Sequence, residues 1–345
     1  MGPALLIRLR PLGPWRIGPD SGARDRVDSV FHSDALYSAL SAAFVRFGLL
    51  DEWLAATFGN PGRPEVRLSS LFPSVNGTLL VVPPRNAWPP AASARVRWKG
   101  AKFVPLKLVE SILAGESPDE RRWTVDGPSE CLVPSDRPRG PFRVSMRSAA
   151  ARDRLAAGVE PHATACLEFN DEAGLWAVAA FADEASRERW TNRLQAAFRL
   201  LADSGFGGER SLGWGHSAMP EFADGVLPDL ILPSREPAAS SAEGEPAPLP
   251  ETAWWLLSLF SPAPEDSIDW NRGNYSLVIR GGRVESAARW GAPKKLTRMI
   301  VEGSVLCAEA PILGTAHDVA PDGFPHPVYR AGYALAIPIP LRVTP

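Results

Sequence analysis

The chain has few cysteines and no long apolar segment, and each absence excludes a class of protein. Only three cysteines occur in 345 residues (Cys131, Cys166 and Cys307), and no two of them form a Cys-x-x-Cys pair. This spacing argues against a disulfide framework and a zinc site. No apolar run approaches the ~20 residues that a membrane-spanning helix needs, and the N-terminus has no signal-peptide pattern. The sequence therefore predicts a reduced, cytoplasmic protein with no membrane partner, metal or cofactor.

A net positive charge is also missing, since the formal net charge is −2. The charge is unevenly distributed, however. Residues 1–150 carry 20 basic and 14 acidic side chains, whereas residues 220–269 carry 1 and 10. One acidic segment thus masks a basic remainder. Of the 37 basic residues only five are lysine, and arginine suits bidentate binding of phosphate. Local charge therefore leaves a nucleic-acid partner open.

The most informative motif is a glycine-rich loop at residues 205–215. It contains Gly205, Gly207, Gly208, Arg210, Ser211, Gly213 and Gly215. Such a loop can wrap its backbone N–H groups around a phosphate, because glycine tolerates positive φ and allows close approach. The alternative is a helix C-cap followed by a turn. The spacing matches neither the P-loop nor the dinucleotide fingerprint.

Periodicity predicts two domains joined by a linker. The expected elements are a strand at 4–10, a helix at 35–47 after an N-cap at Ser33-Asp34, strands at 66–72 and 78–82, an insertion at about 84–168, a strand at 175–181, a helix at 184–202 and a strand at 214–222. This order is typical of a ferredoxin-like or RRM-like unit, whose sheet has one open face. The N-terminal domain spans 1–225, an acidic, proline-rich linker 226–250, and a strand-rich C-terminal domain 251–345.

Six segments resemble one known superfamily, in its order and across nearly the whole chain. They are FHSDALYSAL (31–40), LSSLFPSVNGTLLVVPP (68–84), LADSGFGGERSLGWG (201–215), WWLLSLFSP (254–262), KKLTRMIVEGSVL (294–306) and HPVYRAGYALAIPI (326–339). Together they resemble the RAMP superfamily of CRISPR proteins. The closest resemblance is to the fourth subunit of type III-A (Csm) effector complexes, in the Cas5 group.

This resemblance implies an α+β fold of two ferredoxin-like (βαββαβ) RAMP domains with an inserted β-hairpin thumb. By position the thumb is Arg139–Glu168, with Arg143, Met146 and Arg147 as its contact residues. The implied role is structural: the protein binds the 5′ handle of the crRNA in a type III effector complex of antiviral defence. The implied partners are the large polymerase/HD-type subunit, the backbone RAMP subunit and, indirectly, target RNA.

Within this framework the predicted RNA-binding residues fall into four groups. The first is His32 and Ser33 at a helix N-terminus, which can hold a phosphate or be a plain N-cap. The second is the glycine-rich loop with Arg210, whose alternative is a surface pair with Glu209. The third is Arg8 and Arg10, which share one face of a strand or line a solvated edge. The fourth comprises Lys294, Lys295 and Arg298.

Aromatic residues and histidines complete the predictions. Trp214, Trp254 and Trp255 are expected in the core or an interface, and His216 at the surface. Some RAMP relatives are endoribonucleases that process precursor crRNA with a histidine near the position of His32 as general acid/base. No second residue has the spacing of a catalytic partner, so the sequence favours a non-catalytic protein, with this nuclease as the alternative.

Overall fold

The computed structural model describes residues 2–19, 22–59, 63–90, 92–152, 159–232, 252–286, 288 and 291–341. The α-helices are α1 (Ser33–Phe47), α2 (Leu50–Phe58), α3 (Ala92–Arg97), α4 (Leu106–Leu113) and α5 (Glu184–Ser204). The strands up to residue 232 are β1 (Pro3–Leu9), β2 (Val66–Leu68), β3 (Phe72–Val75), β4 (Thr78–Val81), β5 (Val104–Pro105), β6 (Trp123–Asp126), β7 (Cys131–Pro134), β8 (Phe142–Arg152), β9 (Val159–Phe169), β10 (Ala173–Phe181) and β11 (Glu221–Val226). The fold is α+β, as predicted.

The first sheet has the strand order β11-β1-β10-β3-β4-β5, and β2 also pairs with β10. The predicted strand at 66–72 is wrong in one respect, because it is divided into β2 and β3. Between them, the N–H of Ser70 donates to the carbonyl of Leu257 and that of Leu71 to the carbonyl of Phe31. These backbone groups therefore leave the ladder to reach other parts of the chain. The strand expected from 214 begins only at Glu221.

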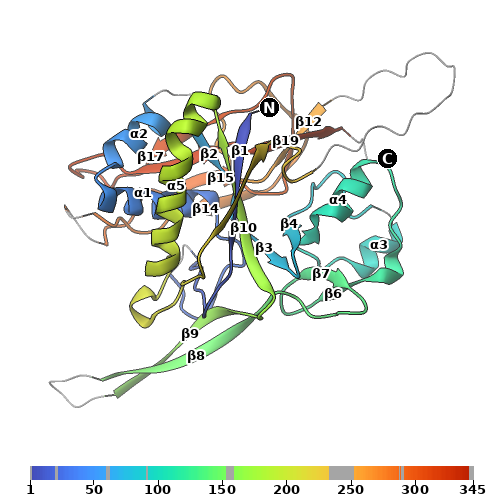
Figure 1. Ribbon diagram of the computed structural model, residues 1–345, viewed down its shortest axis with the longest axis horizontal. Helices are drawn as coiled ribbons and strands as arrows, with labels where there is room; N and C mark the ends of the chain where they lie inside the picture. Colours follow the sequence, from blue (N-terminus) through green and yellow to red (C-terminus); the bar gives the residue numbers. More distant parts are fainter. Residues whose placement is uncertain are drawn as a thin grey trace.

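Helices α1 and α5 contact each other and pack against this sheet, while α4 contacts its β4–β5 end. The side chain of Asp183 accepts a hydrogen bond from the N–H of Ser186 at 2.9 Å and so caps α5. Residues at helical spacing on α5, including Trp190, Leu194 and Phe198, are fully buried. Trp190 packs edge-on against Phe44 of α1, with ring centroids 5.7 Å apart. Figure 1 shows α1, α2 and α5 on one side of the molecule.

The open sheet face expected from the sequence is not found along the central strand. Eight of the nine residues of β10 are buried, so both of its faces are covered. One continuous core contains β10 residues together with Trp255, Leu257 and Tyr333 of the C-terminal half. Trp255 also donates from Nε1 to the carbonyl of Val82 at 3.2 Å. The C-terminal half therefore packs onto the first sheet and fills the face that was expected to be open.

The C-terminal half is built from strands. They are β12 (Thr252–Leu256), β13 (Ile268–Asn274), β14 (Leu277–Arg280), β15 (Thr297–Ile300), β16 (Val305–Ala308), β17 (Gly314–Asp318), β18 (Tyr329–Tyr333) and β19 (Ala336–Pro340). A four-stranded sheet has the order β13-β16-β12-β19, and β14–β15 and β17–β18 form separate pairs. Among the residues described from 252 onward none is helical, so the helices of a complete ferredoxin-like unit are absent there.

The insertion ends in a long hairpin that extends from the body of the molecule (Figure 1). Strands β8 and β9 pair in register from Phe142 opposite Phe169 to Arg152 opposite Val159. The hairpin expected at Arg139–Glu168 is therefore present, with bounds shifted by a few residues.

The start of the expected linker is not a linker. Leu227, Ile231 and Leu232 are buried in the main core, so the globular part continues to at least residue 232. The rest of that linker, residues 233–250, lies outside the described residues. None of the helices in the described ranges combines the length and the apolar composition of a membrane-spanning segment.

Candidate nucleic-acid interface

A cleft of about 440 Å³ lies where α1, the glycine-rich loop and two C-terminal segments meet. The C-terminal segments are residues 280–286 and 326–330. Among the residues predicted to bind RNA, the cleft brings together Gly207, Arg210 and Lys294, which are distant in sequence. Short side chains such as Ala35 and Ser38 line much of its α1 side, together with Tyr37 and Val45.

The charge of the cleft is positive. Its lining includes the cations Arg210, Arg280, Arg283, Lys294 and Arg330. Two carboxylates, Asp34 and Glu285, oppose these five cations, which leaves a formal balance of +3. Apolar side chains such as Leu54 and Leu201 line another part of it. A cationic region beside an apolar one suits a chain of phosphates that carries bases.

The glycine-rich loop has its shape because of close backbone packing. Gly207 has φ +93°, and a Cβ there would lie 2.7 Å from the carbonyl oxygen of Arg16. Gly215 has φ +81°, and a Cβ there would lie 2.2 Å from the carbonyl oxygen of Phe206. The N–H of Gly208 donates to the carbonyl of Arg16 at 2.9 Å. Part of the loop's donor set is thus used inside the protein, and phosphate binding by the remainder stays a prediction.

The other residues of this loop differ in their surroundings. A Cβ on Gly205 would meet the carbonyl oxygen of Trp214 at 2.5 Å, whereas nothing lies within 4 Å of one on Gly213. Ser211 is exposed and does not line the cleft. Trp214 is buried, as predicted, and His216 is half-buried.

Arg210 is paired with a different carboxylate from the one expected. Its guanidinium donates to Glu285 Oε1 at 2.9 Å, and both side chains are about half exposed. The sequence alternative was a pair with the neighbouring Glu209. Glu285 therefore binds the arginine at the position where a phosphate is predicted, on the edge of the cleft.

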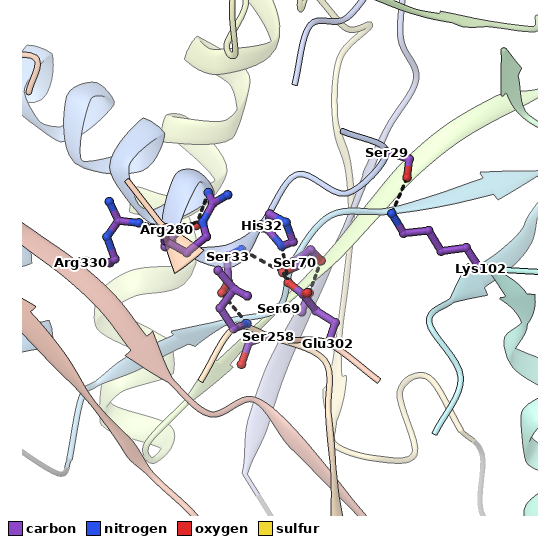
Figure 2. Close-up of polar contacts among 12 residues, drawn as sticks. Ser29, His32, Ser33, Ser69, Ser70, Lys102, Ser258, Arg280, Glu302 and Arg330 are labelled. Atoms are coloured by element: carbon purple, nitrogen blue, oxygen red, sulfur yellow. Dashed lines mark hydrogen bonds and ion pairs between the residues drawn. The ribbon is translucent and has the colours of Figure 1, made fainter. Parts of the chain in front are cut away.

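The N-terminus of α1 is bound by the C-terminal half (Figure 2). The helix begins at Ser33, so the N-cap is His32 and the predicted Ser33-Asp34 cap is wrong. Ser33 is buried; its N–H donates to Ser70 Oγ at 2.8 Å, and its Oγ accepts from the N–H of Leu259 at 3.0 Å. A phosphate at Ser33 has to displace or share these contacts, and its binding there stays a prediction.

His32 has the partner that the sequence did not reveal. Its Nδ1 lies 2.9 Å from Glu302 Oε1, and Glu302 also accepts a hydrogen bond from Ser70. Burial by itself lowers the pKa of His32, but the Glu302 carboxylate outweighs it and the pKa is raised above its ordinary value. Burial raises the pKa of Glu302, yet the His32 charge and the hydrogen bonds bring it below its usual range. Neither residue lines the cleft.

Asp34 forms a buried charge cluster with two arginines. Arg280 donates to both of its oxygens at 3.1 and 3.0 Å, and Arg330 donates at 3.1 Å. The three side chains are at most 8% exposed. Burial raises the pKa of Asp34, but the arginines outweigh it and hold the pKa below its ordinary value. Because Arg330 also donates to the carbonyl of Gly281, this cluster positions the segment that forms one wall of the cleft.

The remaining predicted residues lie elsewhere on the surface. Arg8 and Arg10 are both exposed, at the end of β1. Lys295 pairs with Asp322 at 2.7 Å, and Arg298 is exposed on β15 opposite Ile279. The basic cluster at 294–298 is therefore divided, with Lys294 alone lining the cleft.

The predicted thumb residues cluster at the base of the hairpin. Arg143 donates to Glu168 Oε2 at 2.9 Å, and Arg147 pairs with the other oxygen of the same carboxylate. Met146 is 48% exposed and Val144 is 53% exposed on the same strand. Two side chains two residues apart point to the same face of a strand, so this face of β8 has an exposed apolar part.

Sequence reasoning missed Arg280, Arg283, Glu285, Glu302 and Arg330. One signal was visible: residues 279–283 read Ile-Arg-Gly-Gly-Arg, which is a cationic turn. Glu302 and Arg330 lie inside two of the segments that carry the family resemblance, but nothing local indicates their partners. In the described part of the chain, no three His, Cys, Asp or Glu side chains are grouped to hold a metal ion.

Comparison with known proteins supports the resemblance. Residues 250–339 match the model of the CRISPR Csm4 C-terminal domain. The fold is similar to that of a chain in the crystal structure of a Csm3–Csm4 subcomplex of the type III-A CRISPR–Cas interference complex, with TM-score 0.61 and 17% identity over 98% of this chain and 100% of that one. It is also similar to a chain of a Csm1–Csm4 cassette crystallised with cA4, with TM-score 0.57 and 16% identity over 99% and 100%. No curated protein matches the sequence.

Proposed function

We propose that this Csm4-like RAMP protein is a structural, RNA-binding subunit of a type III CRISPR effector ribonucleoprotein and binds the 5′ handle of the crRNA. The observation that carries the proposal is the match of residues 250–339 to the Csm4 C-terminal domain. The fold of the whole chain supports it, because structures with the same fold come from complexes that contain Csm4 with Csm3 or with Csm1. The corresponding partners here are a backbone RAMP subunit and a large polymerase/HD-type subunit, in the cytoplasm.

We infer that both halves derive from the ferredoxin-like unit. In the first sheet the chain runs β1, α1, β3, β10, α5, β11, and the sheet order is β11-β1-β10-β3. In the second sheet β12, β13, β16 and β19 stand in the equivalent order, β13-β16-β12-β19. The pair β17–β18 occupies the connection between β16 and β19, where such a unit has its second helix.

The cleft is the proposed site for the handle. Arg210 and Lys294 are accessible cations on its wall, while Arg280 and Arg330 are buried and hold the wall in place. A guanidinium such as that of Arg210 has donors only, so it can bind phosphates and base acceptors but not base donors. Contacts to phosphate carry no sequence information, so selectivity comes mainly from splayed bases docked against the loop and α1. The exposed Val144 and Met146 suit a thumb that separates crRNA from target RNA.

The test is a competition series with the reconstituted complex. Handle RNA competes against scrambled RNA of equal length at low and moderate salt, with wild type, Arg210→Ala, Lys294→Ala and the control Arg46→Ala. We expect preference for the handle, a steep fall in affinity with salt, and a loss of about 1–3 kcal/mol for each cleft variant. Arg46 is exposed and does not line the cleft, so its variant should bind normally. Equal affinity for both RNAs refutes handle recognition.

One observation favours the endoribonuclease as a second candidate. His32 is held by a carboxylate 2.9 Å away, as in a general acid/base pair. Against it, the side chain of His32 is only 14% exposed and that of Glu302 3%, and neither lines the cleft. We expect purified protein to leave repeat RNA intact in EDTA. Specific cleavage that disappears in His32→Ala would establish the nuclease instead.

A further inference from the structure

The segment Pro14–Arg16 lies between the glycine-rich loop and the long hairpin. On one side, the N–H of Trp15 donates to the carbonyl of Leu167 at 3.0 Å, and the N–H of Leu167 donates to the carbonyl of Trp15 at 2.8 Å. On the other side, the N–H of Gly208 donates to the main-chain carbonyl of Arg16 at 2.9 Å, and the N–H of Gly215 donates to the carbonyl of Pro14 at 3.0 Å. A continuous backbone hydrogen-bonded connection thus runs from β9 through this segment to the loop.

The side chain of Arg16 strengthens this connection. It is only 7% exposed. Its guanidinium donates to the carbonyl of Ala165 in β9 at 3.0 Å, and to the carbonyls of Ala23, Arg24 and Arg26 at 2.8, 3.2 and 3.3 Å. All four acceptors are main-chain oxygens. Leaving a buried guanidinium without such acceptors costs free energy of folding, so this cation holds the base of the hairpin and segment 23–26 in one arrangement.

The loop side packs on the same residue. A Cβ on Gly208 would lie 3.0 Å from Cδ of Arg16, so only glycine lets the loop rest on the arginine stem without a shift. Trp15 adds ring contacts in both directions: its centroid is 4.7 Å from that of Phe206 in the loop and 6.4 Å from that of Phe169 in β9. A displacement of the loop therefore reaches the hairpin through two adjacent residues.

We propose that Trp15 and Arg16 form a strut that couples the glycine-rich loop to the β8–β9 hairpin, with Arg16 as its positioning residue. The proposal rests on the proposed function: RNA bound at the loop then fixes the direction in which the hairpin projects. Arg16 itself does not line the cleft. Its role is to connect the cleft to a hairpin that does not line it either.

The experiment is hydrogen exchange followed by mass spectrometry on the full chain. Arg16→Met keeps the stem and removes the donors, and Arg46→Met is the matched control, since Arg46 is exposed at the end of α1. Without RNA, we expect Arg16→Met to exchange about tenfold faster than wild type in two peptides, the one that contains Ala165–Leu167 and the one that contains Gly208. Both peptides should change together, because both open when the strut loosens. Faster exchange on only one side, or on neither, overturns the strut.

The second arm adds repeat-derived RNA. In wild type, RNA should slow exchange at both peptides; in Arg16→Met it should slow exchange at the loop alone. Equal slowing of both peptides in the variant overturns the coupling. If wild type binds no RNA, the proposed function fails, and the RNA-free comparison still decides on the strut. If Arg16→Met does not fold, Gly208→Ala loosens the strut from the loop side, and it should accelerate exchange at Ala165–Leu167.

Discussion

Replacing Asp34 by asparagine tests the buried charge cluster that joins α1 to the C-terminal half. The substitution keeps the size of the side chain and removes its charge, so the guanidinium groups of Arg280 and Arg330 lose their carboxylate while they remain buried. Removing one partner of a buried ion pair typically costs about 3–5 kcal/mol, because the remaining charge is uncompensated. The free energy of unfolding of a folded protein is typically about 5–15 kcal/mol, so the expected loss is a large fraction of the total stability.

The assay is urea unfolding followed by tryptophan fluorescence. With an m-value of about 3 kcal/mol/M, the midpoint of Asp34→Asn should fall by about 1 M or more. The control is Asp51→Asn, an exposed residue in the first turn of α2, which should change the free energy of unfolding by less than about 0.5 kcal/mol. A loss below about 1 kcal/mol in Asp34→Asn, which is the range of exposed pairs, refutes the reasoning.

The pH dependence gives a second readout of the same cluster. The folded-state pKa of Asp34 lies below its ordinary value. Its contribution is therefore present above the unfolded pKa of about 3.9 and lost as the pH falls through the folded pKa. Wild type should lose stability in this acid range more steeply than Asp34→Asn. Parallel acid profiles for the two proteins contradict the assignment.

The remaining predictions concern His32, the glycines and Glu285. The folded-state pKa of His32 is raised, so the stability that protonated His32 adds to the folded protein is present below about pH 6.5 and lost as the pH rises through the folded value. In urea titrations from pH 5.5 to 9, Glu302→Gln should remove this loss of stability, and the exposed control Glu309→Gln should keep it. Gly213 and Gly215 have nearly equal positive φ, but of the two only Gly215 lacks room for a Cβ. In thermal unfolding, Gly213→Ala should lower the free energy of unfolding by about 1 kcal/mol, and Gly215→Ala should lower it clearly more. Equal losses contradict the packing argument. Glu285→Gln should tighten RNA binding up to about fivefold, the worth of an exposed ion pair, with Glu309→Gln unchanged in the same titration; weaker binding refutes competition between Glu285 and phosphate.

Local patterns in the sequence determined much of the secondary structure. The 3.6-residue periodicity of 184–202 and 35–47 predicted α5 and α1, whose apolar faces the structure buries except for Phe47 at the end of α1, which is exposed. The segment Ser74-Val75-Asn76-Gly77 predicts a turn between two strands; in the structure Asn76 and Gly77, both with positive φ, form the turn of the β3–β4 hairpin, whereas Ser74 and Val75 belong to β3. These signals are local, because each depends on residues within one or two turns of the chain.

Only the tertiary structure decided the partners of the candidate site. His32 and Glu302 are separated by 270 positions and Asp34 and Arg280 by 246, and no local pattern relates such residues. The covered sheet face has the same origin, since β10 is buried on its second face by a half of the chain that begins after residue 250. A sequence window shows which face of an element is apolar. Which charge opposes which, and which cations remain for a ligand, depends on contacts between elements that only the folded chain brings together.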